Sequence, residues 1–141
     1  MGKGVLTATD LAPRKLGGCR VLVVEPGEDS AAALTAMLRL NGFDARTTHT
    51  GRDALKEMKI LKPRAVILDH DLPDMDCCEA IRRIRMKLDT GACAVLVVSA
   101  HTAQAKRDAA LEAGADDYHM KPADPVVLVR SLNALCNEQE A

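Results

Sequence analysis

The sequence is poor in aromatic side chains. Among its 141 residues it has no tryptophan, one phenylalanine (Phe43) and one tyrosine (Tyr118). Domains that bind single-stranded nucleic acid stack the bases on several aromatic rings, which this chain does not supply. The core of the fold must therefore be built from leucine, valine, isoleucine, methionine and alanine.

The sequence also lacks an excess of charge of either sign. It carries 19 lysine and arginine residues against 20 aspartate and glutamate residues, so its formal net charge is -1. This balance argues against a nucleic-acid-binding surface, because such surfaces are basic. We expect no nucleic acid among the partners of this chain.

Long apolar runs are missing as well. No stretch approaches the ~18 consecutive apolar residues that a transmembrane helix requires. Residues 1–18 contain no apolar segment of the kind found in signal peptides. We therefore expect a cytoplasmic location and no membrane partner.

The five cysteines are odd in number and lack both paired C-x-x-C spacing and histidines at ligand spacing. No zinc site is expected from this pattern. In a cytoplasmic protein we expect the thiols to be reduced. The adjacent Cys77 and Cys78 leave a redox function open, but small, partly buried residues that begin a helix are the favoured interpretation.

Short apolar runs alternate with helical patterns along the chain. The runs typical of strands lie at 21–24, 43–49, 65–69, 94–98 and 117–120. Helix starts are indicated at Asp29 or Ser30, at Thr50 with Asp53, at Asp76 with Glu79, near Thr102, and at Asp124 followed by Pro125. Five strands that alternate with five helices predict an α/β fold, doubly wound around a parallel sheet.

The chain divides into two parts. Residues 1–18 have no periodic pattern, so we expect a flexible N-terminal tail there. Residues 19–138 are one domain's worth of sequence. Because few residues follow the last predicted helix, we expect no output domain.

Polar residues follow the predicted strands at the points where they end. These residues are Glu25, Asp69, Ser99 and Lys121. The carboxyl ends of parallel strands share one edge of a sheet, so the four side chains should converge there. Two acids, a hydroxyl and an ammonium group can handle a phosphoryl group: a carboxylate accepts it, and the hydroxyl and the ammonium bind its oxygens.

The spacing of these residues resembles the CheY-like receiver domain of two-component response regulators. The motifs that carry the resemblance are Asp69-x-x-x-Pro73, Ser99-Ala100, Lys121-Pro122 and Tyr118 three residues before Lys121. The resemblance implies that Asp69 is the phosphoacceptor, that Ser99 and Lys121 bind phosphate, and that Tyr118 is the switch aromatic. It also implies a flavodoxin-like strand order, 2-1-3-4-5.

The resemblance further implies a function and its partners. We expect a single-domain response regulator that receives a phosphoryl group from a histidine kinase or a histidine phosphotransfer protein. A downstream protein partner would bind the face formed by the helix at 102–113, the strand at 117–120 and the last helix. We expect no enzyme activity beyond self-phosphorylation from a phosphodonor and slow autodephosphorylation.

Magnesium is the implied cofactor, held by Glu25, Asp69 and the backbone carbonyl of Asp71. The family usually has two adjacent acids after the first strand, whereas this chain has Glu25 followed by Pro26. Proline offers no side-chain ligand, and Mg²⁺ tolerates little departure from octahedral geometry. We expect reduced Mg²⁺ affinity unless the site is completed by Glu25 itself, by the side chain of Asp71, or by Glu28 or Asp29.

Two alternatives remain open from the sequence. The chain could be a pseudo-receiver, locked by the change at Pro26, that serves as a phosphorylation-independent interaction module. Asp69-His70-Asp71 also resembles the Asp-x-Asp motif of haloacid-dehalogenase-type phosphatases, although that family places the motif on its first strand. Cys77 is a second departure from the receiver pattern, since a glycine commonly stands there, and its Cβ would forbid a positive φ.

Overall fold

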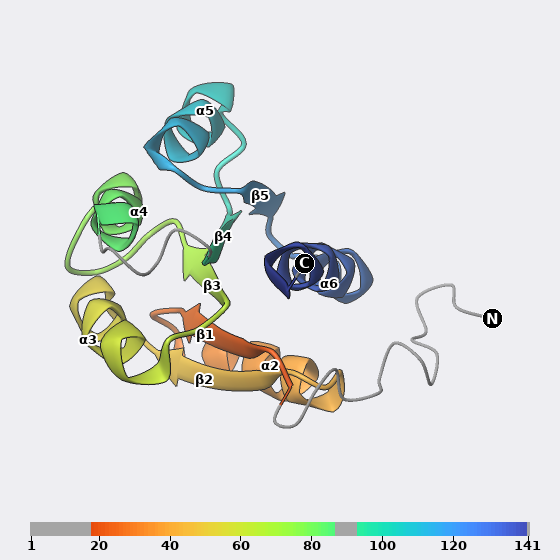
Figure 1. Ribbon diagram of the computed structural model, residues 1–141. Coiled ribbons are helices and arrows are strands. Elements are labelled where there is room, and N and C mark those ends of the chain that lie inside the picture. Colours follow the sequence, from red (N-terminus) through yellow and green to blue (C-terminus); the bar gives the residue numbers. More distant parts are fainter. Residues whose placement is uncertain (1–17, 87–92, 141) are drawn as a thin grey trace.

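The computed structural model describes residues 18–86 and 93–140, with side chains described as far as Cys136. Five parallel strands form one sheet in the order β2-β1-β3-β4-β5 (Figure 1). The strands are β1 (Arg20–Val24), β2 (Asp44–Thr48), β3 (Ala65–Asp69), β4 (Ala94–Ser99) and β5 (Asp117–Met120). The predicted fold class and strand order are confirmed, while the predicted tail at 1–18 lies outside the described residues except for Gly18.

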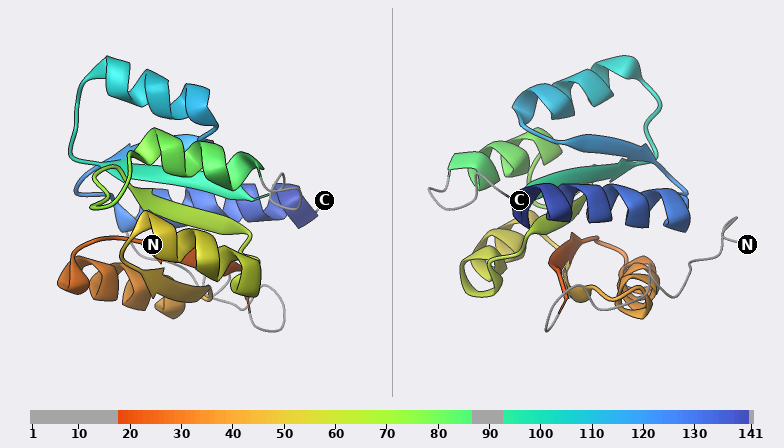
Figure 2. Two further views of the ribbon diagram at one scale, coloured as in Figure 1. Left: turned by 90° about the vertical axis from the view of Figure 1, so that its left-hand side faces the viewer. Right: turned by 45° about the vertical axis from the view of Figure 1, so that its right-hand side comes forward.

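Five described helices cover the two faces of this sheet. They are α2 (Glu28–Leu40), α3 (Gly51–Leu61), α4 (Cys77–Met86), α5 (Gln104–Ala113) and α6 (Pro125–Glu140). Helices α2 and α6 lie on one face, and α3, α4 and α5 lie on the other (Figure 2). Within the described residues, no helix is long and apolar enough to cross a membrane.

The alternation of side chains along each strand builds two cores. Val21 and Val23 of β1 pack with α2 and α6, whereas Leu22 and Val24 pack with the other three helices. Every residue of β3 is buried, because this central strand has a neighbour at each edge and helices over each face. Asp69, the last residue of this strand, therefore lies buried at the carboxyl end of the centre of the sheet.

One predicted helix start is confirmed by the structure and another is wrong. Thr50 caps α3 as predicted, since its hydroxyl accepts a hydrogen bond from the N–H of Asp53 at 3.0 Å. The prediction that Asp29 or Ser30 caps the first helix is wrong, because α2 begins at Glu28 with Gly27 as its N-cap. The N–H of Gly27 donates a hydrogen bond to the Glu25 carboxylate at 2.8 Å. This contact lies directly before the helix, which begins earlier than Asp29 and Ser30 indicated.

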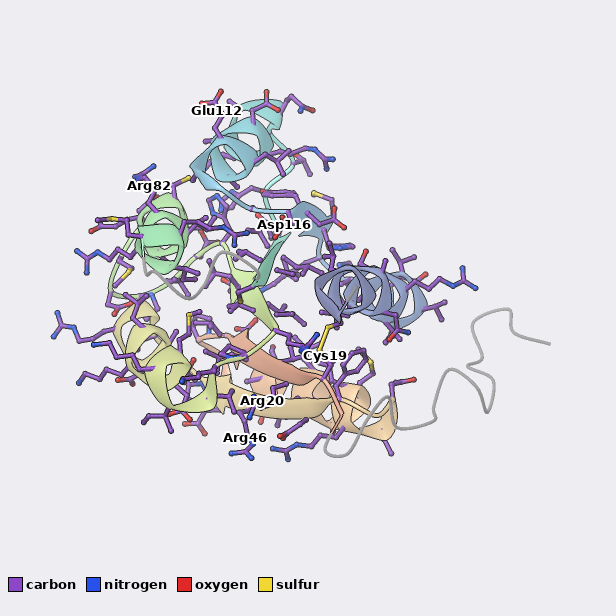
Figure 3. The ribbon with its side chains drawn as sticks, viewed as in Figure 1. Cys19, Arg20, Arg46, Arg82, Glu112 and Asp116 are labelled. Atoms are coloured by element: carbon purple, nitrogen blue, oxygen red, sulfur yellow. A yellow bond between two sulfur atoms is a disulfide. The ribbon has the colours of Figure 1, made fainter. Side chains whose placement is uncertain are left out.

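The expectation of reduced thiols is wrong for one cysteine pair. Cys19, before β1, and Cys136, in α6, form a disulfide (Figure 3). They are 117 residues apart in the sequence, and only the packing of α6 onto the same face of the sheet as α2 brings them together. Cys77, Cys78 and Cys93 are free thiols.

The favoured interpretation of Cys77 agrees with the structure. It is fully buried as the first residue of α4. Burial raises the pKa of its thiol to about 12, so the reactive thiolate is scarce at neutral pH. Among the described residues the one non-glycine position with a positive φ is Lys62. Cys77 therefore has a negative φ, and its Cβ causes no backbone strain there.

Candidate functional site

Asp69 ends β3 at the edge of the sheet where the carboxyl ends of all five strands meet. The residue is 6% exposed. One carboxylate oxygen accepts a hydrogen bond from the N–H of Asp71 at 2.8 Å, and the other forms an ion pair with the ammonium of Lys121. Asp69 is thus a nearly buried carboxylate paired with the Lys121 ammonium.

Lys121 follows β5 and joins two acids across the sheet. Its ammonium lies 3.2 Å from the Glu25 carboxylate as well as against Asp69. Burial alone would lower the pKa of Lys121, but its hydrogen bonds and charge interactions with Asp69 and Glu25 outweigh burial and raise that pKa. The lysine therefore stays positively charged between the two carboxylates.

Ser99 ends β4 and is buried beside this pair of charges. Its hydroxyl oxygen accepts a hydrogen bond from the N–H of His101 at 2.9 Å, and its carbonyl accepts one from the N–H of Lys121 at 2.7 Å. Ser99 is thus fixed to Lys121 through the backbone. The Ser99 hydroxyl can itself donate a hydrogen bond to an oxygen of a ligand in the site.

Tyr118 lies inside the protein, on β5. Its side chain is 5% exposed and packs in the core that faces α3, α4 and α5. Its hydroxyl donates to the carbonyl of His101 at 3.4 Å, and the guanidinium of Arg107 lies 5.9 Å from the ring centroid. The ring therefore contacts both the loop after β4 and helix α5.

The arrangement of Glu25 and Asp69 fits a hard divalent cation. Both carboxylates already meet at one cation, the Lys121 ammonium, so they converge on a common point. With the backbone carbonyl of Asp71, they would supply the all-oxygen ligands that Mg²⁺ prefers. Pro26 adds no ligand.

Of the three ways to complete a magnesium site, the structure favours Glu25, because its carboxylate contacts the same lysine ammonium as the Asp69 carboxylate. The Asp71 carboxylate is turned instead toward His101. Glu28 and Asp29 are exposed in the first turn of α2, where negative charge stabilises the helix dipole. Glu25 is therefore the acid in position to compensate for Pro26.

A cluster of His70, Asp71 and His101 was not predicted from the sequence. Both oxygens of the Asp71 carboxylate lie within 3.1 Å of Nε2 of His101, and one lies 3.4 Å from Nδ1 of His70. The hydrogen bond with His101 is the main reason that the pKa of Asp71 is lowered. The signal was available, since His70 follows β3 and His101 follows β4 at the same sheet edge.

A cavity of about 550 Å³ begins at Glu25, Asp69 and Lys121. It runs between α2 and α6 over the sheet, and its wall is largely apolar, with Leu34 and Leu128 on opposite sides. The charged residues therefore stand at one end of an open groove.

The family of the chain follows from comparison with known proteins. The sequence model of the family described as the response regulator receiver domain matches residues 21–133 of this chain. The chain belongs to the receiver-domain family of response regulators. In this receiver domain Asp69 ends β3, Ser99 ends β4 and Lys121 follows β5. The roles of these residues and of Tyr118 in phosphoryl transfer stay predictions.

Curated relatives of this receiver domain are longer proteins. It is 38% identical over 123 residues to the transcriptional regulatory protein PrrA of Mycobacterium leprae, covering 86% of this chain and 52% of PrrA. It is 36% identical over 121 residues to the DNA-binding response regulator MtrA of Mycolicibacterium smegmatis, covering 86% of this chain and 52% of MtrA. The chain thus spans about half the length of these relatives.

Among solved structures, the receiver domain of the sensor histidine kinase PA1611 from Pseudomonas aeruginosa is similar. The TM-score is 0.78 at 27% identity, over 84% of this chain and 98% of that one. That structure has a magnesium ion coordinated in its active-site cleft. The family match, together with the position of Asp69-His70-Asp71 at the end of the third strand, argues against the haloacid-dehalogenase-type alternative.

Proposed function

We propose that this receiver domain accepts a phosphoryl group on Asp69 from a histidine kinase or a histidine phosphotransfer protein. The observation that supports this most is the nearly buried Asp69 carboxylate held against Lys121 at the shared ends of the strands. One Asp69 oxygen attacks the phosphorus of a phosphohistidine. An O–P bond forms, the P–N bond breaks, and its electron pair stays on the imidazole nitrogen.

Charge neutralisation is the main requirement of this step. The incoming group adds negative charge beside Asp69 and Glu25, which the site would oppose strongly without a cation. Lys121 exchanges its contact with Asp69 for a phosphoryl oxygen, and the Ser99 hydroxyl donates to another. Both residues are held in place by the backbone hydrogen bond between them.

Magnesium is the proposed cofactor. Glu25, Asp69 and the Asp71 carbonyl would hold it, and the ion supplies further neutralisation of phosphoryl charge. We expect its affinity to be reduced, because Pro26 contributes no ligand and Glu25 is engaged by Lys121 and by the N–H of Gly27.

Phosphorylation would change the face formed by α5, β5 and α6, and this face would bind a protein partner. Tyr118 connects the site to this face, since its hydroxyl bonds to His101 and its ring contacts Arg107 of α5. Met120 of β5 and Val127 of α6 are exposed apolar side chains on two of these elements. We propose that the domain acts in the cytoplasm, is not itself an enzyme, and needs neither nucleic acid nor a membrane at this face.

A pseudo-receiver is the second candidate, and Pro26 favours it. In that case the ion pairs of Lys121 with Asp69 and Glu25 lock the site, and the domain binds its partner without phosphorylation.

Incubation with phosphoramidate and Mg²⁺ separates the two candidates by intact-mass spectrometry. The proposed function predicts one phosphoryl adduct on the wild type, dependence on Mg²⁺, and no adduct on Asp69→Asn. If the wild type takes no adduct while Pro26→Asp does, the pseudo-receiver is correct and the first proposal is wrong.

A further inference from the structure

We propose that His70, Asp71 and His101 form a binding site for a borderline divalent transition metal, with Zn²⁺ as its representative. The site is separate from the magnesium site. It uses side-chain atoms of the loops after β3 and β4, and none of these atoms takes part in the phosphoryl chemistry proposed for Asp69.

The donor atoms are close enough to share one ion. One nitrogen from each histidine and one Asp71 oxygen all lie within 4.8 Å of one another. The ligand atoms of a tetrahedral zinc ion, each about 2.1 Å from it, lie about 3.4 Å apart. The nitrogen of His101 and the carboxylate are already 2.9 Å apart. Rotation of the His70 and His101 side chains, which are 11% and 34% exposed, would close the set.

The ligand types select the metal. Two imidazole nitrogens and one carboxylate are typical of Zn²⁺ and its borderline neighbours, whereas Mg²⁺ prefers oxygen ligands alone. The cysteine spacing predicts no zinc site, and no cysteine belongs to this one. Three protein ligands also leave one coordination position open to water.

The ligands are held by the surrounding structure. The N–H of His101 donates to the Ser99 hydroxyl at 2.9 Å. The His70 ring lies between two others, with its centroid 4.7 Å from that of His101 and 6.4 Å from that of Tyr118. Asp71 is anchored by its N–H, which donates to Asp69. These contacts keep the donor atoms of the three residues within 4.8 Å of one another before any metal binds.

A bound ion would strengthen the connection between two loops that the His101 imidazole and the Asp71 carboxylate already join. It would fix His101, whose carbonyl accepts the hydroxyl of Tyr118. Metal binding should therefore change the surroundings of Tyr118, the chain's one tyrosine, and the absence of tryptophan makes its fluorescence a direct readout.

Isothermal titration of the 141-residue chain with Zn²⁺, in excess Mg²⁺ and without reductant, tests the site. We expect one Zn²⁺ per chain and a change in tyrosine fluorescence. His70→Ala and His101→Ala should each weaken binding by more than about 100-fold, since loss of a ligand costs more than loss of an outer-shell contact. His101→Gln, which keeps a polar side chain, provides a second variant should the alanine variant not fold.

Two controls distinguish this site from other donors. His119→Ala removes a histidine that pairs with Asp117 outside the cluster, and Cys78→Ser removes the more exposed free thiol; both should bind Zn²⁺ as the wild type does. Near-ultraviolet absorption of bound Co²⁺ should show no thiolate charge-transfer band. The proposal is overturned if the wild type binds no more tightly than the His70→Ala/His101→Ala double variant, or if Cys78→Ser abolishes binding.

Discussion

Lys121 keeps two carboxylates together that would otherwise repel each other. Its ammonium contacts both Asp69 and Glu25, and these interactions raise its pKa in spite of its burial. A permanently charged group at this point can transfer its contact from the carboxylate to an incoming phosphoryl oxygen. Lys121 is therefore the residue on which charge neutralisation in the site depends most.

Replacement of this ammonium should slow phosphorylation. We expect Lys121→Gln to take up phosphate from phosphoramidate about 100-fold more slowly than the wild type, the usual loss when one stabilising donor is removed. Intact-mass time courses measure the rate. Lys59→Gln, which removes an exposed lysine on α3, is the matched control and should leave the rate unchanged. Equal rates for Lys121→Gln and the wild type would show that the lysine has no such role.

The main site residues could be predicted because each directly follows or ends a strand, and parallel strands end at one edge. Glu25, Asp69, Ser99 and Lys121 meet there for that reason. The direction of the Asp71 side chain could not be predicted, since it depends on a loop conformation that brings His101 within 2.9 Å. The positions of the strand ends follow from the apolar runs in the sequence. The directions of side chains in loops depend instead on contacts between segments that are distant in the sequence.

At the scale of elements, the loop between β3 and α4 is tied to the start of α3. The two oxygens of the Asp74 carboxylate accept hydrogen bonds from the N–H of Gly51 at 2.8 Å and from the N–H of Arg52 at 2.9 Å. Burial alone would raise the pKa of Asp74, but these backbone hydrogen bonds outweigh it and lower the pKa. This contact holds the loop that carries Asp71 and Pro73.

Asp74→Ala should lower the free energy of unfolding by about 1 kcal/mol at neutral pH, the usual cost of losing a side chain that accepts from the first N–H groups of a helix. Because the folded-state pKa is below the unfolded value of about 3.9, the stabilisation is complete above that pH. It is lost as the pH falls through the folded-state pKa. Urea unfolding of both proteins between pH 7 and pH 3 should show the difference shrinking; a difference that is constant with pH would contradict the account.

The helices and strands themselves were predictable from apolar periodicity, with errors at their ends. The strand at 117–120 agrees with β5 residue for residue, because turn signals bound it on both sides. The start of α2 was missed, because the Glu25 carboxylate binds the N–H of Gly27 and no sequence pattern reveals that contact.

At the scale of the molecule, the Cys19–Cys136 disulfide joins the residue before the first strand to the last helix. It was not predictable, since the two cysteines become neighbours only after the sheet and both layers of helices have formed. The bond closes a loop of more than a hundred residues. In the chain-entropy model, a loop of that size corresponds to about 4 to 5 kcal/mol of stabilisation.

Reduction of this bond should lower the free energy of unfolding by about 3 to 5 kcal/mol. Urea unfolding with and without dithiothreitol measures the loss. The variant Cys19→Ser/Cys136→Ser provides the control, because its stability should not respond to the reductant. A wild type that is equally stable in both conditions would show that the disulfide does not constrain the domain.

The central claim is that Asp69 carries the phosphoryl group, and chemical mapping tests it most directly. The protein is incubated with phosphoramidate and Mg²⁺ and then treated with borohydride, which reduces an aspartyl phosphate to homoserine. Peptide mass spectrometry then locates the changed residue. The account predicts homoserine at position 69 alone, in the phosphodonor-treated sample only. Reduction at another aspartate, or no reduction at position 69 under conditions in which the protein is folded, would contradict it.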